Sequence, residues 1–193
     1  FNYALIENNL LNWPAIHKAL PNHTFDQLYA LSPHEWPYSQ WISLLKYKGR
    51  FDLANLLGQL LYNLWLKSNC QQNMYLHNKN TQSIYLNTHS SILVVSVPLH
   101  IKKWQGRGYN QAHLIAKNFV LNTSITYAHN AIFRTKNTDT QVGQTGSNRR
   151  KNMNGAFELN PDIIWPEHVI IIDDVVTTGT TVNEISSLLK KHG

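Results

Sequence analysis

The feature that most constrains the fold is a short aliphatic run followed by two acids and a group of hydroxyls. Residues 169–172 read Val-Ile-Ile-Ile, which predicts a short, fully buried strand of a parallel sheet. Asp173 and Asp174 follow at its carboxyl end, where ligands bind in open α/β sheets. The hydroxyl-rich segment 176–181 then leads into an amphipathic helical pattern over 182–191. Backbone N–H groups at the start of a helix bind phosphate, so the segment predicts a site for a phosphorylated sugar.

A simpler interpretation is a strand that ends in an N-capping Asp before an ordinary helix. We favour ligand binding because the strand, the acid pair and the hydroxyl-rich loop occur together and in this order. In that interpretation the loop binds the phosphate, and the carboxylates of Asp173 and Asp174 accept hydrogen bonds from vicinal sugar hydroxyls.

Length and composition set broad limits. With 193 residues, 42% of them hydrophobic, we expect one domain, or one domain with a small appendage. No apolar run is long enough to cross a bilayer, and we expect a soluble protein. The single cysteine, Cys70, excludes an internal disulfide and a multi-cysteine zinc site within this sequence. The formal charge of +6 favours polyanionic ligands, although a basic surface without function is equally compatible with it.

Apolar periodicity predicts an α/β fold with a small helical part at the N-terminus. Helical spacing is found in four segments before the last helix: 9–19, 39–48, 51–67 and 111–121. Strands are predicted at 92–98, 125–127, 131–133 and 156–159, in addition to 169–172. Residues 68–90 are polar and predict a long loop. Because strands alternate with helices, we expect a mostly parallel sheet flanked by helices.

Two further segments carry charges suited to an anionic ligand. After the strand at 92–98, Gly106 and Gly108 flank Arg107 and allow a close approach of the backbone to a ligand, and Lys102 and Lys103 precede them. We interpret this segment as a diphosphate-binding loop, against the alternative of a plain basic loop before a helix. Residues 134–157 are polar, basic and contain glycine, which is typical of a lid closing over an anion or of an exposed surface segment.

The acid pair and the loop after it resemble the phosphoribosyl diphosphate (PRPP) signature of type I phosphoribosyltransferases. The resemblance implies that Asp173 and Asp174 hold the ribose hydroxyls. It also implies that the loop binds the 5′-phosphate through Val176, Thr177, Thr178, Gly179, Thr180 and Thr181. Lys103, Arg107 and Gly108 would meet the diphosphate, with Arg134 and Arg149 closing from the lid. Mg²⁺ would arrive bound to PRPP rather than to a protein site.

The ordered set of motifs, together with 44–58, resembles the ComF family of competence-associated proteins with a type I phosphoribosyltransferase-like fold. The segments are PLH…RGYNQA, R…N…GAF and IIIDDVVTTGTT. Membership implies a cytoplasmic protein that acts in DNA uptake during natural transformation. We therefore expect a phosphoribosyltransferase-like domain over 36–193. Residues 1–35 stand where the family often has a zinc ribbon but contain no cysteine, and the family's final strand is not found before Gly193.

Three functions remain open at this point. The first is a phosphoribosyltransferase with an unknown acceptor, for which no general base is evident. The second is a non-catalytic competence factor that binds single-stranded DNA or partner proteins. The third is a sensor that binds PRPP without turnover. The aromatic residues that could stack on bases, which we expect to pack in the core instead, are Trp36, Tyr38, Trp41, Tyr47 and Trp104.

Overall fold

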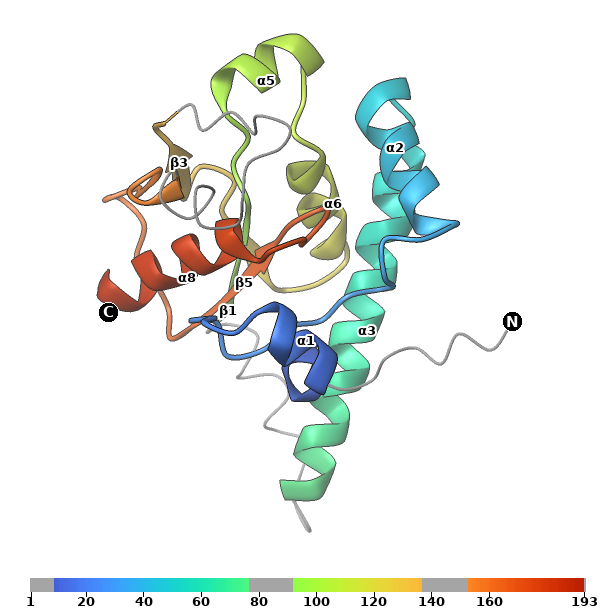
Figure 1. Ribbon diagram of the computed structural model, residues 1–193, viewed down its shortest axis with the longest axis vertical. Helices are drawn as coiled ribbons and strands as arrows, with labels where there is room; N and C mark the ends of the chain where they lie inside the picture. The colour runs from blue at the N-terminus through green and yellow to red at the C-terminus, as the bar shows by residue number, and fades with distance from the viewer. Residues whose placement is uncertain (1–8, 77–91, 137–152, 193) are drawn as a thin grey trace.

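The computed structural model describes residues 9–76, 92–136 and 153–192. Its centre is a parallel sheet of three strands in the order β2-β1-β5, namely Thr126–Tyr127, Ile92–Ser96 and His168–Ile172. Ser96 lies opposite Ile172 in the register of β1 and β5, so these two strands end side by side. Helices cover both faces of this sheet (Figure 1), which confirms the predicted α/β class with a small helical N-terminal part.

Strand β1, rather than β5, is the fully buried strand. It lies between its two neighbours, and Val94 and Val95 have no exposed surface. Strand β5 pairs with β1 alone among the described strands, and its residues up to Ile171 are half-buried or exposed. The prediction of complete burial for 169–172 was therefore wrong, because an aliphatic run indicates a strand without indicating its position in the sheet.

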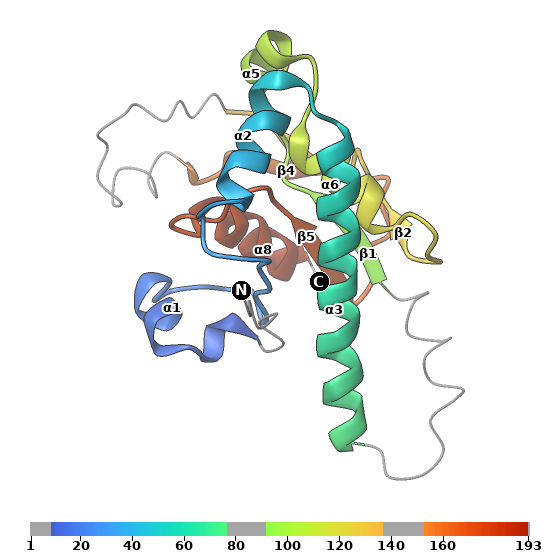
Figure 2. The ribbon, with the colours of Figure 1, turned by 90° about the vertical axis from the view of Figure 1, so that its right-hand side faces the viewer.

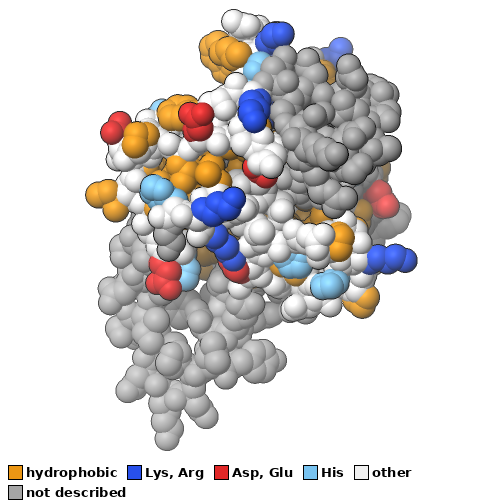
Figure 3. Space-filling model, turned by 60° about the vertical axis from the view of Figure 1, so that its left-hand side comes forward, with side chains coloured by type: hydrophobic (Ala, Val, Ile, Leu, Met, Phe, Trp, Pro, Cys, Tyr) orange, Lys and Arg blue, Asp and Glu red, His pale blue; other side chains and the backbone are white. Residues whose placement is uncertain are grey.

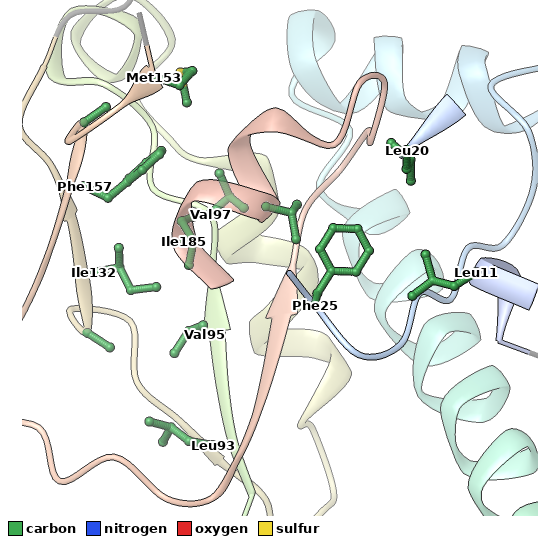
Figure 4. Close-up of a cluster of buried hydrophobic side chains, with 13 residues drawn as sticks. Leu11, Leu20, Phe25, Leu93, Val95, Val97, Ile132, Met153, Phe157 and Ile185 are labelled. Carbon is green, nitrogen blue, oxygen red and sulfur yellow. The ribbon is translucent and has the colours of Figure 1, made fainter. Parts of the chain in front are cut away.

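Alternate residues of β1 point into two separate cores. Leu93, Val95 and Val97 pack against α8 (Thr180–His192), the antiparallel pair β3 (Ile132–Arg134) and β4 (Phe157–Leu159), and the N-terminal segment. Figure 4 shows this core, with Ile185 of α8 between Ile132 and Phe157 on one side and Val95 and Val97 on the other. Successive side chains of a strand point to opposite faces, so one short strand supplies both cores.

The opposite face of the sheet carries three helices. Val94 and Ile172 pack with residues of α2 (Tyr38–Lys48), α3 (Asp52–Leu76) and α6 (Gln111–Phe119). Figure 2 shows α3 running past this face with α6 beside it. The two helices approach closely at Gly58, where an added Cβ would lie 2.7 Å from the Ile115 carbonyl oxygen. A larger residue at this position would force α3 and α6 apart.

The N-terminal segment packs on α8. It contains the 3₁₀ helix η1 (Leu10–Asn12) and helix α1 (Pro14–Ala19). The Thr24 backbone N–H donates to Asn183 Oδ1 at 2.5 Å, and the Thr24 hydroxyl donates to the Asn183 carbonyl at 3.0 Å. Asp26 forms an ion pair with Lys190 at 2.5 Å. Residues 9–28 are thereby fixed against the helix that follows the hydroxyl-rich loop.

Three predicted elements differ from the structure. Helix α3 continues to Leu76, where a loop was expected from residue 68. Strands β3 and β4 form a separate antiparallel pair instead of joining the parallel sheet. Residues 101–107, expected in a loop, form helix α5 (Ile101–Arg107), capped at its start by His100 and at its end by Gly108. Within the described ranges, no helix is both long and apolar enough to cross a membrane.

Candidate functional site

The acid pair lies where the strand ends of β1 and β5 meet. The Val97 backbone N–H donates to the Ile172 carbonyl at 2.9 Å, one residue before Asp173. The chain after β1 and the chain after β5 therefore leave the sheet next to each other. This edge is the carboxyl end of a parallel sheet, the position at which α/β proteins bind ligands.

Asp174 is held by side chains from two helices. Its carboxylate forms an ion pair with Lys46 of α2 and accepts a hydrogen bond from Gln111 Nε2 of α6 at 3.2 Å. The Gln111 side-chain oxygen in turn accepts a hydrogen bond from the Arg107 guanidinium. The Asp174 side chain is only 9% exposed, so its charge lies in a region where water screens poorly. Lys46 thus contacts the acid pair directly, whereas Arg107 is linked to it through Gln111.

Asp173 and Asp174 influence each other's ionisation. The Asp174 backbone N–H donates to Asp173 Oδ1 at 2.9 Å. Burial and the neighbouring Asp174 carboxylate raise the pKa of Asp173 to about 8, although Lys46 acts in the opposite direction. Two acids that share one lysine are not both ionised easily, so Asp173 keeps its proton near neutral pH. A ligand that donates hydrogen bonds to this pair would favour the ionised form of Asp173.

The hydroxyl-rich loop connects the acid pair to α8. Gly179 has a φ of +66°, a conformation that few residues other than glycine adopt without strain. An added Cβ at Gly179 would lie 2.8 Å from Leu20 Cδ2, so the N-terminal segment packs directly on the loop. The Thr178 and Thr180 hydroxyls lie 2.9 Å apart, and Val176 and Thr177 are exposed. The loop therefore offers hydroxyls beside the first turn of α8.

The second charged segment is anchored to both α2 and α6. Arg107 ends α5, and its guanidinium lies 5.5 Å above the centroid of the Tyr47 ring as well as bonding Gln111. The Tyr109 hydroxyl donates to the Leu45 carbonyl. Gly108 has a φ of +82° and ends α5, so its conformation serves a helix cap. The structure thus links Arg107 to Asp174, while Lys103 lies one turn earlier on the exposed face of α5.

Of the two arginines expected in the lid, Arg134 and Arg149, the structure describes only Arg134. Arg134 is the last residue of β3, where its guanidinium lies 5.7 Å from the Phe157 ring centroid and 3.8 Å from Met153 Sδ. These contacts hold it against the antiparallel pair. Arg149 lies outside the described residues. The lid interpretation of 134–157 stays a prediction.

The aromatic residues do not share one environment. Tyr38 and Trp41 pack together, edge to face, against the core beneath α2, as expected. Trp36 and Tyr47 are 72% and 71% exposed, and Trp104 is 49% exposed, so core packing was the wrong expectation for these three. On the face shown in Figure 3, the described lysines and arginines are scattered among acidic, histidine and hydrophobic side chains. A single large basic patch is not seen on that face.

Lys46 and Gln111 were not assigned a role from the sequence. Both lie in segments that carried the family resemblance, 44–58 and 98–112, but neither segment indicates contact with an acid far along the chain. Arg107 is the last residue of α5 and Gln111 the first of α6, so their contact follows from the tight turn between the two helices and not from helical spacing. Within the described residues, no group of three or more His, Cys, Asp or Glu side chains is placed to hold a metal ion.

The parallel sheet, its helical layers and the acid pair at its carboxyl edge define an α/β protein with a phosphoribosyltransferase-like fold. Competence protein F of Haemophilus influenzae is 32% identical over 173 residues, which cover 88% of this chain and 69% of that protein. The DNA utilization protein YhgH of Escherichia coli K12 is 31% identical, over 93% of this chain and 76% of the relative. The YhgH protein of Salmonella typhimurium is 29% identical over the same shares.

The chain belongs to the competence protein F (ComF) family. No model of a protein family matches it, and no solved structure matches it significantly. Family membership therefore rests on the relatives, and the geometry of the site rests on the structure described above.

Proposed function

We propose that the chain binds PRPP with Mg²⁺ at the acid pair and transfers its phosphoribosyl group to a nitrogen nucleophile. The observation that carries the proposal is the position of Asp173 and Asp174. They lie at the carboxyl edge of a parallel sheet, directly before a hydroxyl-rich loop that opens a helix. In the reaction the bond from ribose C1 to diphosphate breaks, and a bond from C1 to the acceptor nitrogen forms.

Each part of the site has a role in this proposal. The acid pair accepts hydrogen bonds from the ribose hydroxyls, and segment 176–181 binds the 5′-phosphate with backbone N–H groups and hydroxyls. Arg107, already linked to Asp174 through Gln111, neutralises the departing diphosphate. Lys103 and Gly108 extend the same segment. Arg134 and Arg149 remain candidates for a lid.

Mg²⁺ enters the proposal as part of the substrate. Magnesium keeps several waters and prefers phosphate oxygens to an all-protein site. Asp174 already has Lys46 as its cation, which supports binding of the metal through the diphosphate and ribose oxygens. The role of the lysine is then to hold the Asp174 carboxylate in position before the substrate arrives.

The biological setting is proposed from the relatives. Their names, competence protein F and DNA utilization protein YhgH, support a function in the handling of DNA that cells take up. We propose a cytoplasmic protein that works with the competence machinery. The acceptor nucleophile is open within this proposal.

Binding and turnover of PRPP test the enzyme proposal separately. Diphosphate release from PRPP and Mg²⁺ is measured with a panel of nucleobases, in the unchanged protein and in Asp173→Asn/Asp174→Asn. Release that needs both an acceptor and the two acids supports transfer. If the protein binds PRPP but no acceptor causes diphosphate release, the proposed transfer is wrong and the protein is a PRPP sensor.

A second function, binding of single-stranded DNA, is favoured by the exposed aromatic residues. Tyr47 lies under the guanidinium of Arg107, and Trp36 is exposed just before α2. Exposed aromatic rings beside cations are the groups on which proteins stack unpaired bases. Trp36→Ala and Tyr47→Ala should each weaken binding of an oligonucleotide, and binding should fall steeply with salt. Equal binding by the variants would remove this candidate.

A further inference from the structure

A cavity of about 470 Å³ opens beside the ends of β1 and β2, and neither Asp173 nor Asp174 lines it. Asn110, His113 and Leu114 line it, and residues three and four apart share one face of a helix. Gln111, which bonds Asp174, points elsewhere from the same first turn. The volume of the cavity lies within the range of small-molecule sites, about 300 to 1,000 Å³. The cavity is therefore a second concave site, separate from the acid pair.

Two residues of one wall, Ser96 and His113, are joined by hydrogen bonds through Tyr127, which lies behind the lining. Ser96 Oγ and the Tyr127 hydroxyl lie 2.9 Å apart, and the same hydroxyl lies 2.6 Å from His113 Nδ1. The His129 ring lies at the far side of His113, with 6.3 Å between the centroids. No hydrogen bond is made by His113 Nε2 to any described residue. With Nδ1 engaged by Tyr127, Nε2 is the atom that offers a donor or acceptor to a ligand.

The other wall is apolar and aromatic. Pro98 and Leu99 line it after β1, and Trp104 of α5 contributes an indole that is 49% exposed. Among the described residues that line it there is no Lys, Arg, Asp or Glu. Burial, His129 and Lys117 lower the pKa of His113, so its imidazole is neutral near pH 7. The cavity thus combines a stacking surface and a few hydrogen-bonding atoms with no formal charge.

These properties select one class of ligand. A phosphate or carboxylate would find no cation among the lining side chains that the structure describes. A purely apolar molecule would bury His113 Nε2 without a partner, which costs about 1 to 3 kcal/mol. A sugar needs more partners than remain, because the Asn110 amide already bonds two backbone groups and the Tyr109 hydroxyl bonds Leu45. A flat ring with polar edges satisfies both walls.

We propose that this cavity binds one neutral heteroaromatic ring of the nucleobase class, stacked on Trp104 and hydrogen-bonded to His113. The ring can belong to a free base or nucleoside, or to one nucleotide of a single strand. The proposal does not require PRPP binding, because neither acid lines the cavity; the two sites share only Gly108, which the proposed function assigns to the diphosphate.

The test measures binding of single nucleosides, of a short oligothymidylate and of an abasic oligonucleotide of equal length, by calorimetry. Trp104→Ala is the test variant and Trp13→Ala the matched control, since Trp13 is similarly exposed, at 45%, and lies outside the cavity. We expect about tenfold weaker binding in Trp104→Ala, because stacking on one aromatic ring contributes about 1 to 3 kcal/mol per base. Trp13→Ala should bind as the unchanged protein does.

The ligands distinguish the two sources of the ring. Tight binding of a nucleoside identifies a free base, whereas tight binding of the oligothymidylate, lost in its abasic counterpart, identifies a base presented by a strand. Either result supports the proposal when it also depends on Trp104. Equal affinities of Trp104→Ala and Trp13→Ala, or no binding of any of these probes to the folded protein, would overturn it. Asp173→Asn/Asp174→Asn should retain this binding, so failure at the PRPP site is seen independently.

Discussion

At the scale of single residues, the sharing of Lys46 between two carboxylates governs the chemistry of the site. Asp174 has the direct ion pair, and Asp173 lies next to it without a cation of its own in the described contacts. Burial and the neighbouring Asp174 carboxylate therefore keep a proton on Asp173 near neutral pH. Both the stability of the fold and the affinity for a hydroxyl-bearing ligand depend on this arrangement.

Replacing Lys46 by Met should destabilise the protein. The change leaves the poorly exposed Asp174 carboxylate without its cation, and we expect a loss of about 1 to 3 kcal/mol in the free energy of unfolding. Urea denaturation measures the loss, with Lys46→Arg as the control that keeps the charge. In an Asp174→Asn background the same substitution should cost much less. Equal costs in both backgrounds would mean that Lys46 acts through something other than this pair.

The raised pKa of Asp173 predicts a pH dependence of stability. The folded protein holds this proton up to a pKa of about 8, whereas the unfolded chain releases it near 3.8. Between these values the folded state binds more protons, so the contribution of Asp173 is present at low pH and is lost as the pH rises toward 8. The asparagine of Asp173→Asn cannot ionise. The stability of this variant relative to the unchanged protein should therefore rise as the pH increases from 3.8 to about 8, by up to about 1.4 kcal/mol per pH unit. Parallel pH profiles of the two proteins, from denaturant unfolding, would contradict the assignment.

At the scale of elements, the loop between β5 and α8 depends on one glycine for two reasons. The positive φ of Gly179 and its contact with Leu20 both exclude a side chain. The loop thus joins the ligand site to the N-terminal segment. Docking of that segment, through Thr24 and Asn183, sets the position of the first turn of α8.

Gly179→Ala should destabilise the protein by about 1 to 2 kcal/mol and weaken PRPP binding, since the backbone strain distorts the proposed phosphate loop. Gly106→Ala is the control: its added Cβ would meet no atom within 4 Å, and it lies within α5. Alanine is the better helix former, so this control should be neutral or stabilising. Adding Leu20→Ala to Gly179→Ala should relieve the contact but not the strain. Because Leu20 is buried, the reference for the double variant is Leu20→Ala alone, and equal stability of these two proteins would show that φ is unimportant here.

Some of these elements could be predicted from the sequence and others could not. Alternation and aliphatic runs gave the strands at 92–98 and 169–172 and the acid pair between strand and loop. The ion pair of Lys46 with Asp174 was not predictable, because it joins residues far apart in the sequence whose contact depends on how α2 packs. Helix α5 was missed because two glycines near its end favoured a loop, although one of them is its cap. Burial of β5 was overestimated because it depends on strand order.

At the scale of the whole molecule, the sheet is a thin partition between two cores. Strand β1 contributes side chains to both cores. The ligand site and the cavity lined by His113 both lie at the carboxyl ends of the strands, around the first turn of α6. The position of α6 therefore affects both sites. That position is set by its close contact with α3 at Gly58.

Gly58→Ala should destabilise the molecule by about 1 to 3 kcal/mol, although alanine is the better helix former. The added Cβ would lie 2.7 Å from both Asn118 Cβ and the Ile115 carbonyl oxygen, which are too close to be relieved by a side-chain rotation alone. Denaturant unfolding measures the effect. Gln59→Ala on the exposed side of α3 is the control and should change stability by less than about 0.5 kcal/mol. A stabilised Gly58→Ala protein would show that the helices are not in close contact.

Calorimetric titration of PRPP with Mg²⁺ is the most direct test of the central claim, that Asp173 and Asp174 form a PRPP site. The unchanged protein should bind with a dissociation constant in the micromolar range, about −8 kcal/mol. Asp173→Asn/Asp174→Asn should lose this binding while remaining folded. The control, Asp26→Asn, makes the same acid-to-amide change at an exposed residue that pairs with Lys190 of α8, and it should retain the binding. Absence of binding to the folded, unchanged protein, or undiminished binding to the double variant, would contradict the account.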